Sequence, residues 1–435
     1  MSSFGRIAVV GAGWAGLTCA VELAAAGVPV TVFEAAKQLG GRARSVELDG
    51  QQLDNGQHIF VGAYHETLRL MRLVGEKPEV VMQRLPLQVE VPDANPPFRL
   101  ALPLLPAPWH LALGLLAARG ATLGEKLSAA RFMQRLKRRH YRLIRDTTVA
   151  AWLDQEGQRG AIRRHLWEPL CLAALNTAPE NASAQIFANV LRDSLGGNRD
   201  ATDLLLARTD LGHVFPVHAA RFIEEHGGIL RLSSRVTGFE REGNGWRIGD
   251  EHFEDLVLAV GPYSLPPLLV HRPAHEPLLH QLADFSYEPI ATVYMAYPED
   301  LRLPFPMLGM AGPTGQWVFD RGALDGTAGV MAFVLSANGD WDTLEDEELV
   351  QQLHREFERV IEHSVGPVLP PHWHRVIRER RATFSCTPNL PRPGNETAER
   401  GLWLAGDYTC AEYPATLEGA VRSGVATAQR ILATR

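Results

Sequence analysis

The stretch Ile7–Glu34, "IAVVGAGWAGLTCAVELAAAGVPVTVFE", places two short apolar runs on either side of a glycine-rich turn and a helical segment. Ile7–Val10 and Val30–Phe33 are typical of buried strands, because they are continuous runs of apolar, mostly β-branched residues. The helix expected between them covers about Ala15–Ala26. Strand, helix and strand in this order predict a parallel βαβ unit and therefore an α/β protein.

The turn itself has the spacing G-x-G-x-x-G. Its first glycine permits a tight turn, its second lets the backbone approach a pyrophosphate, and its third lets helix and strand pack closely. The helix that follows directs its positive end at the phosphate. Glu34 ends the second strand where a ribose-binding carboxylate is expected, and its charge would repel a 2′-phosphate. A turn that binds no phosphate is the alternative. We expect a Rossmann-like dinucleotide site that includes Gly11, Gly13, Trp14, Ala15, Gly16 and Glu34.

The acid is followed closely by "GGRARS", Gly40–Ser45. Gly41 lets the backbone fold over a pyrophosphate and Arg42 can neutralise its charge, although a solvated surface arginine is the alternative. With these residues the chain resembles the superfamily of FAD-dependent amine oxidases and phytoene desaturases, whose signature is GxGxxGL, an acid and then GGR. The resemblance implies non-covalent FAD in a Rossmann-like domain of the amine oxidase type, also called GR2-like.

A second motif lies near the other end of the chain, in "LWLAGDYTCAEYPATLEGAVRSG", Leu402–Gly424. The resemblance implies that Gly406 and Asp407 line the ribityl and phosphate region of the flavin. It also implies that the backbone near Leu417 faces the flavin pyrimidine, where a helix start favours negative charge. A loop or N-cap aspartate is the alternative for Asp407.

Three middle segments complete the expected cofactor site. The resemblance places the backbone of Val236 at the adenine and Gly261 near the pyrophosphate. It also places "DNGQH", with Gly56, Gln57 and His58, beside the flavin ring. His58 is our candidate for the proton donor or for a group that orients the substrate. A histidine satisfied by backbone and packing is the alternative, and Asp54 is expected to anchor the segment.

The cofactor elements are far apart in the chain, which predicts a discontinuous FAD-binding domain of residues 1–85, 205–285 and 385–435. A mixed α+β substrate domain is expected to cover the flavin with residues 86–204 and 286–384. Within it, Pro86–Asp203 should be mostly helical, and a helix at about Leu344–His363 should back a sheet. The strands of that sheet are expected at residues 289–297, 316–320 and 329–335.

A narrower resemblance joins "GAGWAGL" to "LDNGQHIFVGAYHETLRLMRLVG", Leu53–Gly75, and to the C-terminal motif. These stretches are similar to the hydroxysqualene dehydroxylase branch of the superfamily. The resemblance implies reductive removal of an allylic hydroxyl from hydroxysqualene, with hydride from reduced flavin, in squalene and hopanoid synthesis. An oxidative desaturase of the carotenoid or phytoene type is one alternative, and a non-catalytic prenyl-binding carrier of the same fold is another. No residue pattern identifies the electron donor.

Composition sets further limits. The chain has 435 residues, 46% of them apolar, and a formal net charge of −7, so no nucleic-acid partner is expected. Its four cysteines are scattered without metal-ligand spacing, which predicts no metal site and a reducing, cytoplasmic location. Cys386, in "ATFSCTPN", is expected to be an inert thiol without a covalent link to flavin.

The segment 102–145 suggests contact with a membrane. An uncharged stretch, Leu102–Ala118, precedes Arg131–Arg145, which contains basic residues and no acid. On a helix, Phe132, Leu136 and Ile144 would share one side, which suits peripheral attachment to anionic lipid on the inner face of the cell membrane. A core helix with a solvated basic face is the alternative.

Overall fold

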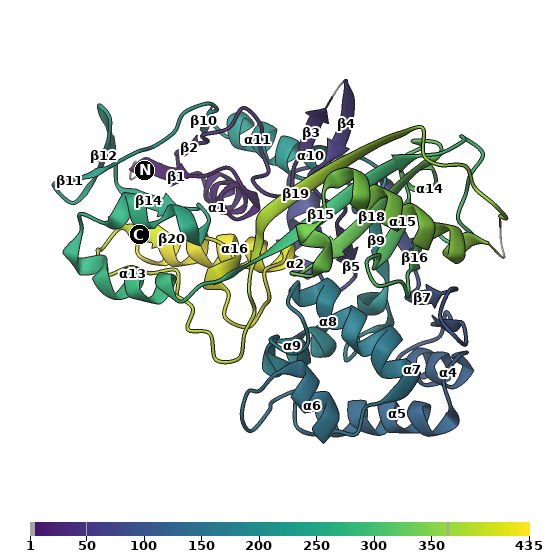
Figure 1. The fold of residues 1–435 in the computed structure, drawn as a ribbon. Coiled ribbons are helices and arrows are strands. Elements are labelled where there is room, and N and C mark those ends of the chain that lie inside the picture. The colour runs from purple at the N-terminus through teal and green to yellow at the C-terminus, as the bar shows by residue number, and fades with distance from the viewer. Residues whose placement is uncertain (1–4, 49, 363–364) are drawn as a thin grey trace.

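The computed structural model describes residues 5–48, 50–362 and 365–435. Its first layer is a parallel five-stranded sheet in the order β10-β2-β1-β14-β20 (Figure 1). Strands β1 and β2 lie where the sequence predicts them, and the other three strands come from the middle and the end of the chain. The strands are β1 (Ile7–Val10), β2 (Val30–Phe33), β10 (Ile229–Arg231), β14 (Asp255–Leu258) and β20 (Leu402–Leu404). The predicted α/β, Rossmann-like architecture is confirmed.

Every residue of β1, β2, β14 and β20 is buried, which explains why these strands are mostly apolar, whereas the edge strand β10 is partly exposed. Ile7 and Val9 pack into the cluster formed with α1 (Trp14–Ala25) and α16 (Leu417–Ala433), while Ala8 and Val10 face the opposite cluster. Helix α1 contacts both α16 and α11 (Pro216–Glu225). The predicted starts of α1, at about Ala15, and of α16, at Leu417, lie within one residue of the observed ones.

The second layer is an antiparallel five-stranded sheet in the order β16-β17-β18-β15-β19. Its outer face packs on α15 (Asp346–Ile361), which confirms the backing helix. The expected end of that helix at His363 lies outside the described residues. The strands are β15 (Tyr287–Ala296), β16 (Met307–Gly309), β17 (Trp317–Asp320), β18 (Val330–Ser336) and β19 (Trp373–Phe384), and the short α14 (Arg321–Leu324) follows β17.

A helical region completes the lower part of the molecule in Figure 1. It is preceded by a hairpin, β7 (Gln88–Val91) and β8 (Phe98–Ala101), which the expectation of a mostly helical Pro86–Asp203 did not include. The π-helix Arg163–Trp167 joins α7 to α8. The helices are α4 (Trp109–Ala117), α5 (Leu123–Arg138), α6 (Val149–Gln155), α7 (Gly160–Ile162), α8 (Glu168–Leu175) and α9 (Ala184–Ser194).

Smaller elements connect these layers. Three small sheets pair β3 (Ser45–Leu48) with β4 (Gln51–Asp54), β9 (Leu204–Ala207) with β5 (Ile59–Val61) and β6 (Met82–Leu85), and β12 (Gly245–Ile248) with β11 (Glu240–Glu242) and β13 (Glu251–Phe253). The remaining α-helices of the described residues are α2 (His65–Leu73), α3 (Pro78–Val81), α10 (Leu211–Val214), α12 (Pro266–Leu269) and α13 (Glu276–Ala283). The domain boundaries expected from the sequence stay a prediction.

The basic segment differs from the lipid-facing helix that Arg131–Arg145 suggested. Helix α5 ends at Arg138, and Phe132 and Leu136 are buried against the core, where Phe132 contacts the rings of Trp152 and Trp167. The apolar side of α5 is therefore a core contact, whereas Ile144, which was expected on the same side, lies beyond the end of this helix and is 99% exposed. No helix in the described part of the chain is long and apolar enough to cross a bilayer.

Candidate active site and cofactor chamber

A cavity of about 950 Å³ lies between the parallel sheet, the antiparallel sheet and the helical region. All the predicted cofactor residues except Gly16 line it, together with His58. We call this cavity the chamber. It brings together three distant parts of the chain, because its lining includes Gly11, Gly13, Trp14, Ala15, Glu34, Gly41, Arg42, Gly56, Gln57, Val236, Gly261, Gly406, Asp407 and Leu417.

The glycine turn shows two kinds of close approach. Gly11 has a φ of +108°, and a Cβ there would lie 2.6 Å from the carbonyl oxygen of Ala259. At Gly16 a Cβ would lie 2.0 Å from the Gly11 oxygen, so this glycine allows helix and strand to pack and has no place in the lining. Gly13, by contrast, meets nothing closer than 3.9 Å, which leaves room for a ligand to pass its backbone.

A second glycine pair lies opposite the first. Gly13 and Gly40 form a parallel backbone bridge, and a Cβ on Gly41 would lie 3.1 Å from the Cα of Gly13. Helix α1 begins at Trp14, and its N-cap, Gly13, provides no side-chain hydrogen bond. The first N–H groups of this helix therefore have no side-chain cap, which is the arrangement that binds a phosphate.

Glu34 and Trp14 hold the two glycine loops, around Gly13 and around Gly41, in position. The Glu34 carboxylate accepts hydrogen bonds from the Ala12 N–H at 2.7 Å and the Ala36 N–H at 2.8 Å. Trp14 is 3% exposed and donates from Nε1 to the Ala43 carbonyl oxygen at 3.2 Å. Its ring packs against Phe60 and Phe215, so most of this side chain belongs to the core and it holds the second glycine loop in place.

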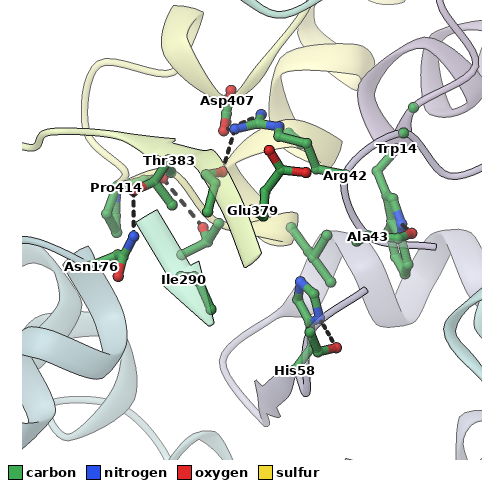
Figure 2. A pocket seen from close by; sticks show the side chains of 18 of the residues that line it. Trp14, Arg42, Ala43, His58, Asn176, Ile290, Glu379, Thr383, Asp407 and Pro414 are labelled. Atoms are coloured by element: carbon green, nitrogen blue, oxygen red, sulfur yellow. Dashed lines mark hydrogen bonds and ion pairs between the residues drawn. The ribbon is translucent and has the colours of Figure 1, made fainter. Parts of the chain in front are cut away.

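Arg42 and Asp407 connect the two ends of the chain. Arg42 Nη2 donates to Asp407 Oδ2 at 2.7 Å, and Nη1 donates to the Ala382 carbonyl oxygen at 2.6 Å (Figure 2). Burial lowers the pKa of Arg42, but the charge and hydrogen bond of Asp407 outweigh it and the net pKa is raised. The guanidinium is therefore always charged in a chamber that, among its acids, also contains Glu379.

The C-terminal motif is held by a buried polar network. The Gly406 N–H donates to Ser423 Oγ at 2.8 Å, and Asn395 Nδ2 contacts the same oxygen at 3.2 Å. Helix α16 begins at Leu417, after an N-cap, Thr416, whose hydroxyl accepts from the Gly419 N–H at 3.1 Å. This helix start lines the chamber. Its contact with the flavin pyrimidine, which the resemblance implied, stays a prediction.

These features fit a flavin dinucleotide. A negatively charged pyrophosphate fits the strip without side chains between the two glycine loops, the helix start without a side-chain cap, and the arginine. The carboxylate at the end of β2 fits one of the two sugars beside the pyrophosphate. These features stand at one side of a chamber whose far side is apolar. A long molecule with a charged middle and a flat ring can contact both sides.

The far side of the chamber is formed by hydrocarbon and aromatic side chains. They come from the inner face of the antiparallel sheet and from the π-helix and α8. Because few polar side chains line this side of the chamber, it favours an apolar substrate. Its lining includes Leu166, Leu170, Ala174, Ile290, Met307, Trp317, Phe319, Val334 and Ile377.

His58 lies below the cluster of Arg42, Glu379 and Asp407 in the view of Figure 2. The charge of Arg42 still acts on the His58 ring. Its Nδ1 is 3.0 Å from the Gly56 carbonyl oxygen. Since a carbonyl only accepts, Nδ1 carries the hydrogen and Nε2 offers a lone pair. Burial lowers the pKa of His58, so the neutral form is favoured.

Asp54 anchors the same segment from behind, as expected. Its carboxylate accepts from the Leu211 N–H at 2.9 Å and lies 3.6 Å from Arg321 Nη1. The Tyr294 hydroxyl donates to its backbone carbonyl at 3.0 Å. Burial raises the pKa of Asp54 to about 6.

Thr292, Glu379 and Tyr408 are among the polar residues of the chamber that were not predicted from the sequence. Thr292 interrupts the chamber side of an otherwise apolar strand, "PIATVYMAY", and this polar position in an inward-facing alternation is a signal that could have identified it. Tyr408 follows Asp407 and is fully buried. Cys386 is buried, and burial raises its pKa to about 12, which agrees with an inert thiol. No cluster of three metal-ligating residues occurs in residues 5–48, 50–362 and 365–435.

The chain matches the model of the family "Flavin containing amine oxidoreductase" over residues 14–432. The cyclohexylamine oxidase of Brevibacterium oxydans has the same fold, with a TM-score of 0.72 and 18% identity over 99% of both chains. The chain therefore belongs to the flavin-containing amine oxidoreductase family, and it is an FAD-dependent oxidoreductase.

Comparison with individual members of the family gives more specific similarities. A protein of Rhodopseudomonas palustris named hydroxysqualene dehydroxylase is 32% identical to it over 98% of both chains. A 15-cis-phytoene desaturase of Synechococcus elongatus is more distant, at 24% identity over 98% of this chain and 96% of the other.

Proposed function

We propose that the protein removes the hydroxyl group of hydroxysqualene and produces squalene, with reduced FAD as the hydride source. The observation that carries the proposal is the single chamber, in which a glycine-rich, arginine-containing side faces a long apolar side. The similarity to a hydroxysqualene dehydroxylase supports the same substrate class. The oxidative desaturase alternative is less favoured, because the phytoene desaturases are more distant.

The chemistry follows from the substrate and from the walls of the chamber. When bound, reduced FAD supplies a hydride, so that one allylic alcohol and one reduced flavin give one hydrocarbon, one oxidised flavin and one water. An allylic C–O bond breaks readily because the positive charge is delocalised. The apolar walls exclude bulk water, which would otherwise capture the cation.

The residues of the chain contribute by binding and orientation. We assign Gly13, Gly41 and Arg42 to the pyrophosphate, Glu34 to a ribose, and Asp407 to the ribityl chain. His58 is a poor proton donor in this structure, since the lowered pKa favours a neutral ring whose Nε2 can only accept. We therefore assign it the orienting role, in which Nε2 accepts a hydrogen bond from the substrate hydroxyl.

Anaerobic incubation of the dithionite-reduced holoenzyme with hydroxysqualene tests the activity. We expect squalene by mass analysis, and none with the oxidised holoenzyme. If the oxidised form instead desaturates a phytoene-type polyene, the oxidative alternative is correct. If neither conversion occurs, the proposed substrate class is wrong.

We also infer that α4 and the start of α5 dock on a membrane. Leu104, Trp109 and Leu116 are 71%, 64% and 58% exposed, and Leu123 and Leu127 add further exposed apolar surface. We call these five residues the α4–α5 surface. Exposed basic residues follow on α5, including Arg131, Lys137 and Arg138. An apolar surface beside positive charge suits an anionic bilayer.

The inferred docking site supports the delivery of a water-insoluble substrate. Figure 1 shows α4 and α5 at the end of the molecule farthest from the parallel sheet. His165 lines both the chamber and a smaller hollow. Ala121 and Thr122, in the chain segment that connects α4 to α5, also line this hollow. A substrate that enters from the membrane through this hollow would reach the apolar side of the chamber first. The cytoplasmic location expected from the cysteines stays a prediction.

A further inference from the structure

Thr292 has a buried hydroxyl that no protein group satisfies. The residue is 1% exposed, and its Oγ1 has no hydrogen-bond partner among the described residues. Its neighbours across β18 and β19 are Val334 and Ile377, whose hydrocarbon side chains cannot bond to it. A buried hydroxyl without a partner is unfavourable, and a ligand that completes its hydrogen bonds would remove this cost.

The strand directs the Thr292 side chain to the chamber side of the sheet. Side chains alternate along β15, so Ile290 and Thr292 line the chamber while Ala291 and Val293 pack on the opposite face, toward α15. An apolar residue would suit the surroundings of Thr292 better. Its hydroxyl is therefore a local exception on an apolar wall that favours hydrocarbon.

A second polar group lies close by. The position that a Cβ on Gly56 would occupy is 3.9 Å from Thr292 Oγ1 and 3.5 Å from Cε1 of His58. Because Gly56 has no side chain, this small space stays open between the hydroxyl and the imidazole. Nδ1 of His58 is already engaged with the Gly56 carbonyl oxygen, so Nε2 is the free acceptor of the ring.

We propose that Thr292 is a specificity-determining residue that binds the substrate hydroxyl before it leaves. This inference rests on the proposed function. Thr292 Oγ1 donates to the oxygen of the substrate hydroxyl, and that hydroxyl donates to His58 Nε2. The product has no hydroxyl and therefore forms neither of these two hydrogen bonds. Thr292 and His58 together thus favour the binding of substrate over product and promote product release.

The oxidised holoenzyme allows this to be tested by binding alone, because it has no hydride to transfer. Dissociation constants for hydroxysqualene and for squalene are measured in the same detergent micelles from changes in flavin absorbance. In Thr292→Val, which keeps the shape and removes the hydroxyl, we expect hydroxysqualene to bind about tenfold more weakly and squalene to bind as before. Thr292→Ser should restore most of the preference.

Thr31→Val is the matched control. Thr31 is also fully buried with an unpartnered hydroxyl, but it lies on β2 outside the chamber. Both valine variants should retain their thermal stability, since each removes an unsatisfied polar atom, and Thr31→Val should leave both dissociation constants unchanged.

Two results would overturn the proposal. One is a Thr292→Val protein that keeps the wild-type preference for the hydroxylated ligand. The other is a changed flavin spectrum of the ligand-free variant with no change in that preference, which would mean that the hydroxyl serves the cofactor. If the wild-type enzyme makes no squalene, the proposed function fails instead, whatever the Thr292 variants bind.

Discussion

The guanidinium of Arg42 and the carboxylate of Asp407 form a 2.7 Å ion pair although they lie 365 positions apart in the chain. Arg42 follows the second glycine pair, and Asp407 follows the last strand of the parallel sheet. The pair therefore joins the two chain ends on one wall of the chamber. Because the Asp407 side chain is 6% exposed, the pair lies in a poorly solvated place where each charge depends on the other.

Loss of either partner should weaken FAD binding. In Asp407→Asn the amide keeps the shape but removes the charge that holds Arg42, and we expect FAD affinity to fall by about tenfold or more. Equilibrium dialysis with flavin fluorescence measures the affinity. Arg69→Ala is the control, because Arg69 pairs with Glu22 and Glu66 outside the chamber. Equal losses in both variants would mean that the Asp407 effect is not specific to the cofactor.

Gly13→Ala separates cofactor binding from folding. Gly13 has a φ of −73°, which alanine adopts freely, and its Cβ would have only one neighbour, at 3.9 Å. The FAD-free protein should therefore keep its melting temperature, while the added methyl blocks the pyrophosphate and reduces FAD affinity by at least about tenfold. Gly124→Ala, on an exposed helix position, is the control. Full FAD binding by Gly13→Ala would contradict the assignment of this backbone to the phosphate.

Much of the cofactor side could be predicted because its residues have local reasons for their positions. The G-x-G-x-x-G turn, Glu34 and the GGR motif follow one another within or just after a single βαβ unit, so their placement needs little knowledge of the rest of the chain. Gly406 and Asp407 were harder to place, since no local rule brings them to Arg42. The resemblance to known flavoproteins supplied that link.

What the sequence left open or did not reveal has a physical cause. An apolar stripe on a basic helix suits lipid and protein core equally, and only the packing of Phe132 on Trp152 and Trp167 decides that it is core. Thr292 was missed for a related reason. Its polar position within the strand can be read from the sequence, but its hydrocarbon neighbours Val334 and Ile377 belong to strands that are distant in the sequence.

FAD should be released completely when the protein is denatured. Cys386 is buried, and burial raises its pKa to about 12, so its thiolate is scarce at neutral pH and cannot attack the flavin. Acid precipitation of the yellow holoenzyme should leave all flavin in the supernatant. Flavin that stays with the pellet in wild type but not in Cys386→Ser would show a covalent bond.

The α4–α5 surface should control membrane binding. Replacing the exposed Trp109 and Leu116 with serine removes two large apolar side chains, which should lower the partition coefficient on anionic liposomes by at least about tenfold. Co-sedimentation measures the bound fraction. The control is Val80→Ser with Val270→Ser, because these side chains are 63% and 59% exposed elsewhere. Unchanged sedimentation of the Trp109/Leu116 variant would contradict the inferred docking site.

Asp54 should make stability depend on pH in a defined direction. Burial raises its folded-state pKa to about 6, above the unfolded value of about 3.9, so protonation favours the folded state. This contribution is fully present below about pH 4 and is lost as pH rises through about 6. Asp54→Asn keeps an oxygen that can accept from the Leu211 N–H and cannot ionise. Its unfolding free energy relative to wild type should therefore rise by about 3 kcal/mol between pH 4 and pH 7.

Urea unfolding at a series of pH values measures this difference, with the exposed Asp300→Asn as control. A relative stability that stays flat, or that falls toward neutral pH, would show that Arg321 keeps the Asp54 carboxylate ionised in the folded protein.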